Sequence, residues 1–347
     1  MSLQGLVDLI SESGEFQSVI ERTAKREKQL VLGLTGSQKS LLTAAVADQR
    51  KITMFISYNQ HQTEMIAQDL HNLLPDRLIS VFSPYELFPH EEVIVDWELR
   101  KNRLEVLKNI RVPGSIICTS IQALCEALVS PEVFYRHVIN IDLDSRIELE
   151  KFSADLVALG YERVDMVESY GQFSIRGGII DVYSYTANNP VRIELFDDEV
   201  DSIRIFDVNN QLSLEKTDAA TFFPARERIY VDYNIEQVRE LIWAEALTQS
   251  EGLIKANYEQ EADTLLANSA KHLELLETAG YFPGIDQYLP FMSKPYTLLD
   301  YLPANSLVLV NEPARVKEYA KLYLQDVSET IFGLLAKGRI LPNIADM

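Results

Sequence analysis

The segment from Gly33 to Ser40 constrains the fold of this chain more than any other feature. It reads Gly-Leu-Thr-Gly-Ser-Gln-Lys-Ser, which departs at a single place from the phosphate-binding loop pattern G-x-x-x-x-G-K-[ST]. An apolar run at residues 29–32 precedes it, and a helical run at 41–47 follows it. A strand, a loop and a helix in this order predict an α/β domain built on a parallel sheet.

The exception is Gln38, which stands where the pattern has its last glycine. In such loops backbone N–H groups cradle phosphate oxygens, the lysine reaches the terminal phosphates and the hydroxyl holds magnesium. Lys39 and Ser40 are present. The glycine that the pattern has before the lysine leaves room for the phosphate to approach the backbone, and the larger side chain of Gln38 fills that room. We therefore expect Gly33, Gly36 and these three residues to form a degenerate nucleotide site. A chance near-match in an ordinary strand–turn–helix remains the alternative.

A nucleotide-hydrolysing site also needs an acidic residue at the end of a neighbouring strand, where it positions magnesium and water. The best candidate is the apolar run 306–310, which ends in Asn311 and Glu312. An asparagine in place of the metal-binding aspartate lacks the charge. We expect no catalytic residues, no bound metal and no ATP or magnesium cofactor in this chain.

The spacing of apolar runs predicts the domain organisation. Strands at 29–32, 52–56, 78–81 and 115–119 alternate with helices, including one at 60–74, which is typical of a parallel sheet with helices on both faces. From residue 139 a helix at 151–159 precedes closely spaced strands, and long charged helices follow between 235 and 279. The prediction has three parts: 1–138, the first part of a degenerate P-loop domain; 139–224, an inserted α+β domain; and 225–347, which completes the discontinuous first domain and ends in a linker.

Within the insertion, the run from Val191 to Phe196 has the alternation of a strand with one buried face. Arg192, Glu194 and Phe196 share the other face, Asp197 and Asp198 supply a turn, and 200–206 returns as an antiparallel strand. Arg176, from a strand at 172–176, can lie on the same face. Arginines and an aromatic ring on a solvent-facing surface are typical of protein-binding hot spots. An Arg–Glu pair within the module, of little energetic value, is the alternative.

Charge and composition restrict the classes of function. The net charge is −20, and residues 139–224 carry 17 Asp and Glu against 7 Lys and Arg, a net of −10. Because nucleic-acid affinity comes largely from cations that neutralise phosphates, we expect a poor DNA binder. No apolar stretch of about 20 residues and no basic leader occurs, so we expect a cytoplasmic protein without membrane contact. Cys118 and Cys125 are expected to be buried thiols, and the histidines show no metal-binding spacing.

Several blocks in a fixed order resemble the N-terminal region of the bacterial transcription-repair coupling factor (Mfd) family, whose first subdomains are similar to the excision-repair protein UvrB. The resemblance covers nearly the whole chain and depends on residues 33–40, 173–182, 191–200, 272–281 and 296–301, followed by 311–313. UvrB would have an intact loop and an Asp-Glu-Ser-His element, so both departures favour the coupling factor. The stretch 85–106 is also too short for the aromatic hairpin with which UvrB grips DNA. Core packing is expected for its aromatic residues Tyr85, Phe88 and Trp97.

The resemblance implies that the inserted domain binds the damage-recognition ATPase UvrA in transcription-coupled nucleotide excision repair. Carried over position by position, Arg176 and Arg192 would make charge-assisted hydrogen bonds, Glu194 would pair with a basic partner residue and Phe196 would be the apolar anchor. RNA polymerase, DNA and an ATP-dependent translocase activity are expected only through domains outside this chain, and this region would dock on the motor within the full protein. Two alternatives stay open: an active P-loop ATPase or helicase lobe that tolerates Gln38, and an autoinhibitory structural clamp.

Overall fold

The computed structural model describes residues 3–47, 51–85, 96–278 and 281–346. The chain divides into two compact units, each assembled from three stretches of sequence. The first unit comprises residues 1–85, 105–126 and 297–325. The second comprises residues 86–104, 127–296 and 326–347. Two helices, α5 (Trp97–Asn109) and α12 (Pro313–Ala336), contribute residues to both units.

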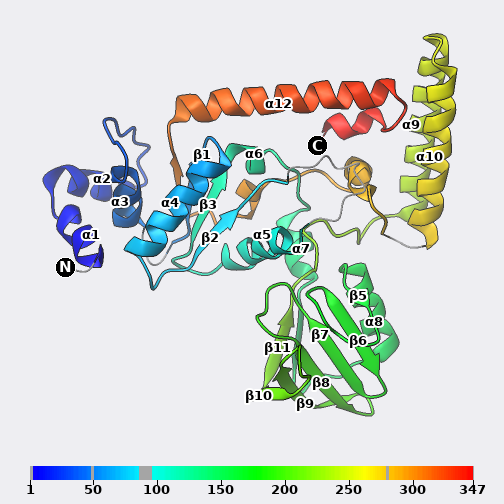
Figure 1. Cartoon of the computed structure of the whole chain (residues 1–347), viewed down its shortest axis with the longest axis horizontal. Coiled ribbons are helices and arrows are strands. Elements are labelled where there is room, and N and C mark those ends of the chain that lie inside the picture. The colour runs from blue at the N-terminus through cyan, green and yellow to red at the C-terminus, as the bar shows by residue number, and fades with distance from the viewer. Residues whose placement is uncertain (1–2, 48–50, 86–95, 279–280, 347) are drawn as a thin grey trace. The chain divides into compact units, whose positions relative to one another are not determined.

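A four-stranded parallel sheet forms the centre of the first unit, with strand order β12-β1-β3-β2 (Figure 1). Every residue of β1 and β3 is buried, as expected for central strands of a parallel sheet covered on both faces. Helices α3 and α4 pack on it through an apolar cluster that includes Phe55, Leu70 and Cys118. The elements of this unit are α1 (Leu3–Ser11), α2 (Gly14–Ala24), α3 (Gln38–Val46), β1 (Thr53–Ser57), α4 (Gln60–Leu73), β2 (Ile79–Phe82), β3 (Ile116–Ser120), α6 (Ile121–Leu124), the 3-10 helix η2 (Leu298–Tyr301) and β12 (Leu307–Val310).

The α/β class and the parallel sheet predicted from the sequence are confirmed. The expected strands near 52–56, 78–81, 115–119 and 306–310 are β1, β2, β3 and β12, and the helix at 60–74 is α4. The expected strand at 29–32 is wrong, because these residues have no regular secondary structure. Leu30 and Leu32 are 72% and 79% exposed. An apolar run becomes a strand only where a neighbouring strand accepts its hydrogen bonds, and here none does among the described residues.

Antiparallel sheets dominate the second unit. A six-stranded sheet has the order β10-β9-β8-β7-β6-β5, with only the β5–β6 pair parallel, and a separate ladder joins β4 to β11 (Figure 1). The helix α8 (Leu149–Ala158) agrees with the helix expected at 151–159, and it buries Phe152 and Leu156. The remaining bounds are β4 (Ile139–Asp142), β5 (Glu162–Arg163), β6 (Gln172–Arg176), β7 (Ile179–Tyr183), β8 (Val191–Phe196), β9 (Glu199–Phe206), β10 (Ser213–Thr217) and β11 (Ala219–Phe222).

The predicted hairpin within this sheet is confirmed. β8 and β9 pair antiparallel across a turn at Asp197 and Asp198, and Asp197 has a φ of 61°, in the left-handed region that tight turns require. A register shift after Glu194 interrupts the ladder. Val191 and Ile193 are buried as expected, whereas Leu195 is only partly buried. The shift therefore loosens the end of the strand that carries Phe196.

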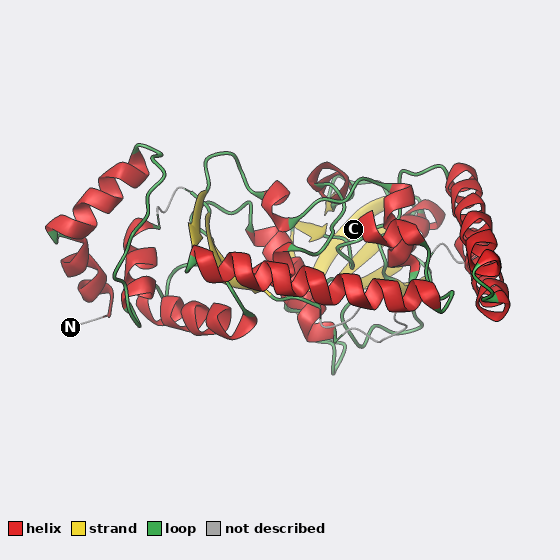
Figure 2. Ribbon diagram, turned by 90° about the horizontal axis from the view of Figure 1, so that it is seen from above, coloured by secondary structure: helices red, strands yellow, loops and turns green. Residues whose placement is uncertain are grey.

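Two long helices, α9 (Ile235–Lys255) and α10 (Glu259–Thr278), pack side by side, as both ribbon views show (Figures 1 and 2). Their contact surface includes Val238, Ile242, Leu265 and Leu276. Both helices lie within the span 235–279 for which the sequence predicts long helices. The other helices of this unit are α7 (Pro131–Arg136), η1 (Ile285–Tyr288), α11 (Leu289–Met292) and η3 (Pro342–Asp346).

One buried ion pair ties α5 to the end of the β-rich region. The Arg103 guanidinium donates from Nε and Nη2 to the two carboxylate oxygens of Glu227, both at 2.7 Å, and neither side chain is accessible to solvent. This two-pronged geometry satisfies both charges where water cannot reach them. The pair was not predicted, because its partners lie 124 residues apart in sequence.

The remaining expectations concern cysteines, membranes and metals. Cys118 is buried, and burial raises the pKa of its thiol to about 12, so it is inert at neutral pH. Cys125 is only partly buried, which corrects the expectation of a buried thiol.

In the described part of the chain, no helix is both long and apolar enough to cross a membrane. Those residues also contain no group of His, Cys, Asp and Glu arranged to hold a metal ion.

Candidate functional site

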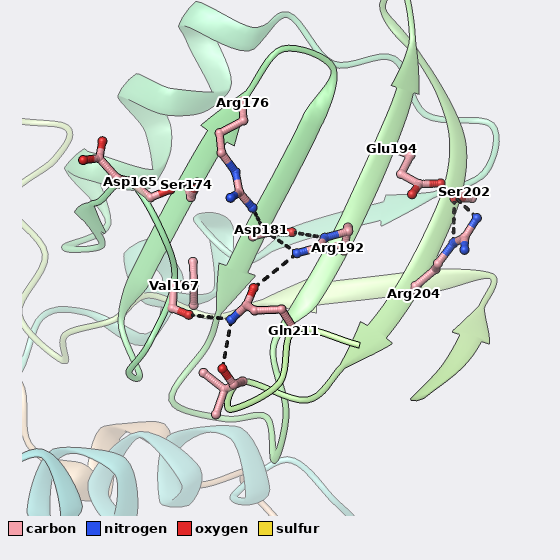
Figure 3. Close-up of polar contacts among 11 residues, drawn as sticks. Asp165, Val167, Ser174, Arg176, Asp181, Arg192, Glu194, Ser202, Arg204 and Gln211 are labelled. Carbon is pink, nitrogen blue, oxygen red and sulfur yellow. Dashed lines mark hydrogen bonds and ion pairs between the residues drawn. The ribbon is translucent and has the colours of Figure 1, made fainter. Parts of the chain in front are cut away.

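One face of the six-stranded sheet is organised around a buried carboxylate. Asp181, at the centre of β7, is 1% exposed and lies opposite Arg192 of β8 in the ladder. Arg192 donates from Nε to Asp181 Oδ1 at 2.7 Å and from Nη2 to Oδ2 at 2.9 Å, and Arg176 of β6 donates to the same Oδ2 at 2.7 Å (Figure 3). Two guanidinium groups from two flanking strands therefore share one buried acid.

Arg192 is held more tightly than Arg176. Its guanidinium lies 4.5 Å from the ring centre of the buried Phe206, and Gln211 accepts a further hydrogen bond from its Nη2 at 3.4 Å. The amide nitrogen of Gln211 in turn donates to the carbonyl oxygens of Val167 and Val208 (Figure 3). The hydrogen bond to Asp181 raises the pKa of Arg192 above its ordinary value. The Arg192 side chain is 17% exposed, against 48% for Arg176.

Glu194 belongs to a second polar group on the same face. Its carboxylate accepts from Ser202, and from Arg204 Nη2 at 3.0 Å, both on the neighbouring strand β9 (Figure 3). All three side chains are partly exposed. The internal Arg–Glu pair that the sequence left open is therefore present, but the arginine is Arg204 rather than Arg192.

Phe196 is the most exposed large apolar residue of this sheet. Its side chain is 77% exposed at the last position of β8, directly before the Asp197–Asp198 turn. An aromatic ring on a solvated hairpin end contributes nothing to the domain's own core. Its exposure leaves a large apolar area available to a partner.

The four residues singled out from the sequence thus share one sheet but differ in their surroundings. Arg176 and Arg192 converge on one acid, Glu194 belongs to the adjacent group and Phe196 lies at the end of its strand. Sequence reasoning missed Asp181. The available signal was a lone carboxylate among the apolar residues of Ile179–Tyr183, where a buried acid needs a cationic partner.

The loop from Gly33 to Ser40 has a different character. Gly33 and Gly36 have φ values of 84° and 50°, and α3 begins at Gln38. The side-chain amide oxygen of Gln38 accepts from the backbone N–H of Thr35 at 2.8 Å. In an intact phosphate-binding loop, backbone N–H groups point at the ligand. Here the N–H of Thr35 already donates to the Gln38 side chain.

The two polar side chains that follow are also engaged within the protein. Lys39 Nζ donates to Glu312 Oε1 at 2.5 Å, and Ser40 Oγ donates to Asp69 Oδ2 of α4 at 2.6 Å. The hydrogen bond from Lys39 is the main reason that the pKa of Glu312 lies below its ordinary value. Glu312 also pairs with Arg315 at 3.1 Å. Sequence reasoning placed Lys39 and Glu312 in one site, and they do meet.

Asn311 occupies the end of β12, where the sequence argument required an acid. Its backbone N–H donates to Ile56 O at 2.8 Å, which continues the ladder beyond the last residue of the strand. Its side chain is buried, and Nδ2 has no hydrogen-bond partner among the described residues. The position therefore presents an uncharged amide in place of the carboxylate through which proteins usually hold Mg²⁺.

Comparison with known proteins agrees with this geometry. The UvrB interaction domain family matches residues 139–227, which contain the six-stranded sheet and the β4–β11 ladder. The transcription-repair-coupling factor of Bacillus subtilis is 36% identical over 346 residues, covering 99% of this chain and 29% of that protein. The UvrABC system protein B of Thermotoga maritima is 29% identical over 304 residues, covering 82% of this chain and 46% of that protein. That of Thermosipho africanus is 28% identical over the same length.

This chain spans less than a third of the coupling factor and about half of the UvrB proteins. Because it matches the coupling factor from end to end and UvrB over most of its length, both resemblances found in the sequence are confirmed. The chain belongs to the UvrB-like region of the transcription-repair coupling factor family.

Proposed function

We propose that this chain recruits UvrA through the polar face of its six-stranded sheet, as the UvrB-like module of a transcription-repair coupling factor in nucleotide excision repair. The family match to the UvrB interaction domain covers this sheet. The observation that carries the proposal is the exposed Phe196 at the end of the strand that carries Arg192, in the sheet where a buried acid holds two arginines in place.

The shared acid has a direct bearing on binding. Each arginine side chain loses rotamer freedom when it is immobilised at an interface, which opposes association. Asp181 removes much of that freedom before the partner binds, because Arg176 and Arg192 both donate hydrogen bonds to its buried carboxylate. Nearly half of the Arg176 side chain is exposed, so it retains donors that face outward. We infer that Arg176 and Phe196 make the direct contacts with UvrA. Arg192 mainly holds Asp181, and with it Arg176, in position, and only the small exposed part of its side chain can touch the partner.

The test is a titration of purified UvrA with this chain, without nucleotide or DNA. Phe196→Ala is expected to weaken binding about thirtyfold or more, the loss typical of a hot-spot residue. Arg176→Ala is expected to weaken it less. Phe332→Ala is the matched control, because Phe332 is a comparably exposed phenylalanine on α12, outside the sheet.

Arg192→Ala needs a separate reading, since it also removes a partner from the buried Asp181. Loss of UvrA binding in that variant counts only if its thermal unfolding midpoint stays close to that of the unchanged protein. Unchanged affinity in both Phe196→Ala and Arg176→Ala would show that this face is not the binding surface.

We further propose that the loop at Gly33–Ser40 neither binds nor hydrolyses ATP in this chain. The support is the set of internal contacts that occupy its polar groups: Gln38 on the Thr35 amide, Lys39 on Glu312 and Ser40 on Asp69. A bound triphosphate would have to break each of them. Millimolar ATP with magnesium should leave the unfolding midpoint unchanged, in the protein and in Lys39→Ala alike, whereas a ligand present at 100 times its Kd would add about 2.7 kcal/mol. A midpoint that rises with ATP and no longer rises in Lys39→Ala would instead support the ATPase alternative.

A further inference from the structure

A second cluster of aromatic and basic side chains lies apart from the Asp181 group, within the second unit. Trp97, at the start of α5, is 51% exposed, so the expectation of core packing is wrong for this residue. Its ring stacks on Tyr170 with 5.4 Å between centres and 18° between planes. Tyr85 is partly buried, and Phe88 lies outside the described residues.

Behind Tyr170 the stack continues inward. The Tyr170 ring centre lies 4.2 Å from that of Tyr183 and 5.8 Å from that of Tyr185, the latter pair nearly parallel at 20°. Tyr185 is buried. Among the described residues Trp97 is therefore the outermost ring of this stack, and about half of its surface is exposed.

The chain also keeps a glycine where the stack needs space. Gly171 has a φ of 75°, and a Cβ at this position would lie 2.6 Å from the Tyr185 ring. Any larger residue would displace the tyrosine and strain the backbone. The glycine thus lets the backbone next to Tyr170 approach the Tyr185 ring closely.

Cations border this stack. Lys101 lies one helical turn after Trp97, so both side chains project from the same face of α5. Its Nζ is 4.7 Å from the ring centre of Tyr170 and donates to the phenol oxygen at 3.1 Å. The guanidinium of Arg100 lies 5.8 Å from the ring centre of Tyr185. The positive charges thus lie over the rings of Tyr170 and Tyr185, which stand behind Trp97 in the stack.

Arg226 adds a third cation with unsatisfied donors. Its guanidinium lies over the Tyr281 ring, and its Nε and Nη1 are buried without a hydrogen-bond partner among the described residues. Burial, with the nearby charge of Arg100, lowers the pKa of Arg226 to about 10. Buried donors without acceptors are rare and unfavourable, so Arg226 keeps a positive charge near Arg100 at an energetic cost.

We propose that this cluster binds single-stranded nucleic acid, with a base stacked on Trp97 and backbone phosphates at Arg100 and Lys101, while the buried Arg226 adds positive charge behind them. An exposed aromatic ring with cations close to it is the arrangement with which proteins bind unpaired bases and their phosphates, and base–aromatic stacking is tolerant of sequence. The chain's net charge of −20 opposes the binding of any polyanion, and so do two nearby acids, Asp96 directly before α5 and Glu98 in its first turn. Affinity should therefore be modest and confined to low salt.

The experiment uses the fluorescence of Trp97 in the whole 347-residue chain. Trp243 on α9 is the only other tryptophan, so Trp243→Phe leaves Trp97 as the sole indole. Titration with a short oligothymidylate at low salt should quench its emission saturably. The logarithm of the association constant should fall with that of the salt concentration with a slope of about −1.4, as expected for two neutralised phosphates.

The variants separate stacking from charge. Trp97→Ala, followed by anisotropy of a labelled oligonucleotide, should weaken binding about tenfold or more. Lys101→Gln should make the salt slope shallower by about 0.7. Lys255→Gln, which removes an exposed lysine from the end of α9, is the matched control and should change neither quantity.

Three ligands decide between sources of affinity. An oligomer of abasic sugar-phosphates of the same length supplies phosphates without bases, and a duplex supplies bases that are already stacked. Both should bind at least about tenfold more weakly than the single strand. Equal binding of the abasic oligomer would reduce the cluster to an anion site and overturn the proposal. So would affinity that Trp97→Ala leaves unchanged, or the absence of saturable binding.

Discussion

Lys39 and Glu312 form an ion pair although 273 residues separate them in the sequence. Lys39 follows the first residue of α3, and Glu312 follows β12, the edge strand next to β1. Glu312 has a φ of 52°, a left-handed conformation that is uncommon for a residue with a side chain. This geometry directs an acid from one sheet edge onto the lysine of a phosphate-loop-like segment.

The stability that this pair contributes should depend on pH. The pKa of Glu312 is lowered in the folded protein, so its contribution is present above the ordinary glutamate pKa, about 4.3, and is lost as the pH falls through the lowered value. Glu312→Gln should unfold at a lower urea concentration than the unchanged protein at pH 7. Because both side chains are partly exposed, the difference should stay below about 1 kcal/mol and should vanish in acid. A difference that grows as the pH falls would contradict this assignment.

Removing the shared acid should be more damaging than removing the exposed Arg176. Asp181→Ala leaves Arg192 largely buried and without its main counter-charge, and we expect it to lower the free energy of unfolding by about 3 kcal/mol. Arg176→Ala, at the more exposed side, should lower it by about 1 kcal/mol or less. The matched control is Asp198→Ala, which removes an exposed acid that pairs with Arg146 at 3.4 Å. Comparable losses of unfolding free energy for Asp181→Ala and Asp198→Ala in urea denaturation would mean that the buried Asp181 stabilises the fold no more than an exposed acid does.

The Arg103–Glu227 pair allows a double-mutant test. Arg103→Met leaves a buried carboxylate without its arginine, and we expect a loss of about 3 to 5 kcal/mol. Combining it with Glu227→Leu removes both charges and should recover much of that loss, since two apolar side chains can fill the same space. Unfolding free energies of the two single variants and the double variant measure the coupling. Losses that simply add would show that the two residues do not depend on each other.

Much of the fold follows from local sequence. The strands β1, β3 and β12 are short apolar runs, and α4 begins at Gln60 after Asn59, whose side chain caps it by accepting from the Gln62 amide at 3.0 Å. The β8–β9 hairpin follows from alternating residues around two aspartates. These patterns depend on neighbours in the chain, which a sequence displays directly. The run at 29–32 has the same apolar character but forms no strand, because a strand also needs a partner edge that its own residues cannot specify.

The sequence by itself determined that Gly33–Ser40 lacks its last glycine, that 191–206 is a hairpin and that Arg192, Glu194 and Phe196 face away from the core. Only the tertiary structure decided the partners: Glu312 for Lys39, Asp181 for two arginines, Arg204 for Glu194 and Tyr170 for Trp97. The physical reason is that side-chain direction follows from local backbone geometry, whereas an ion pair or a ring stack requires two distant segments to meet within a few ångströms. That meeting is a property of the packed chain.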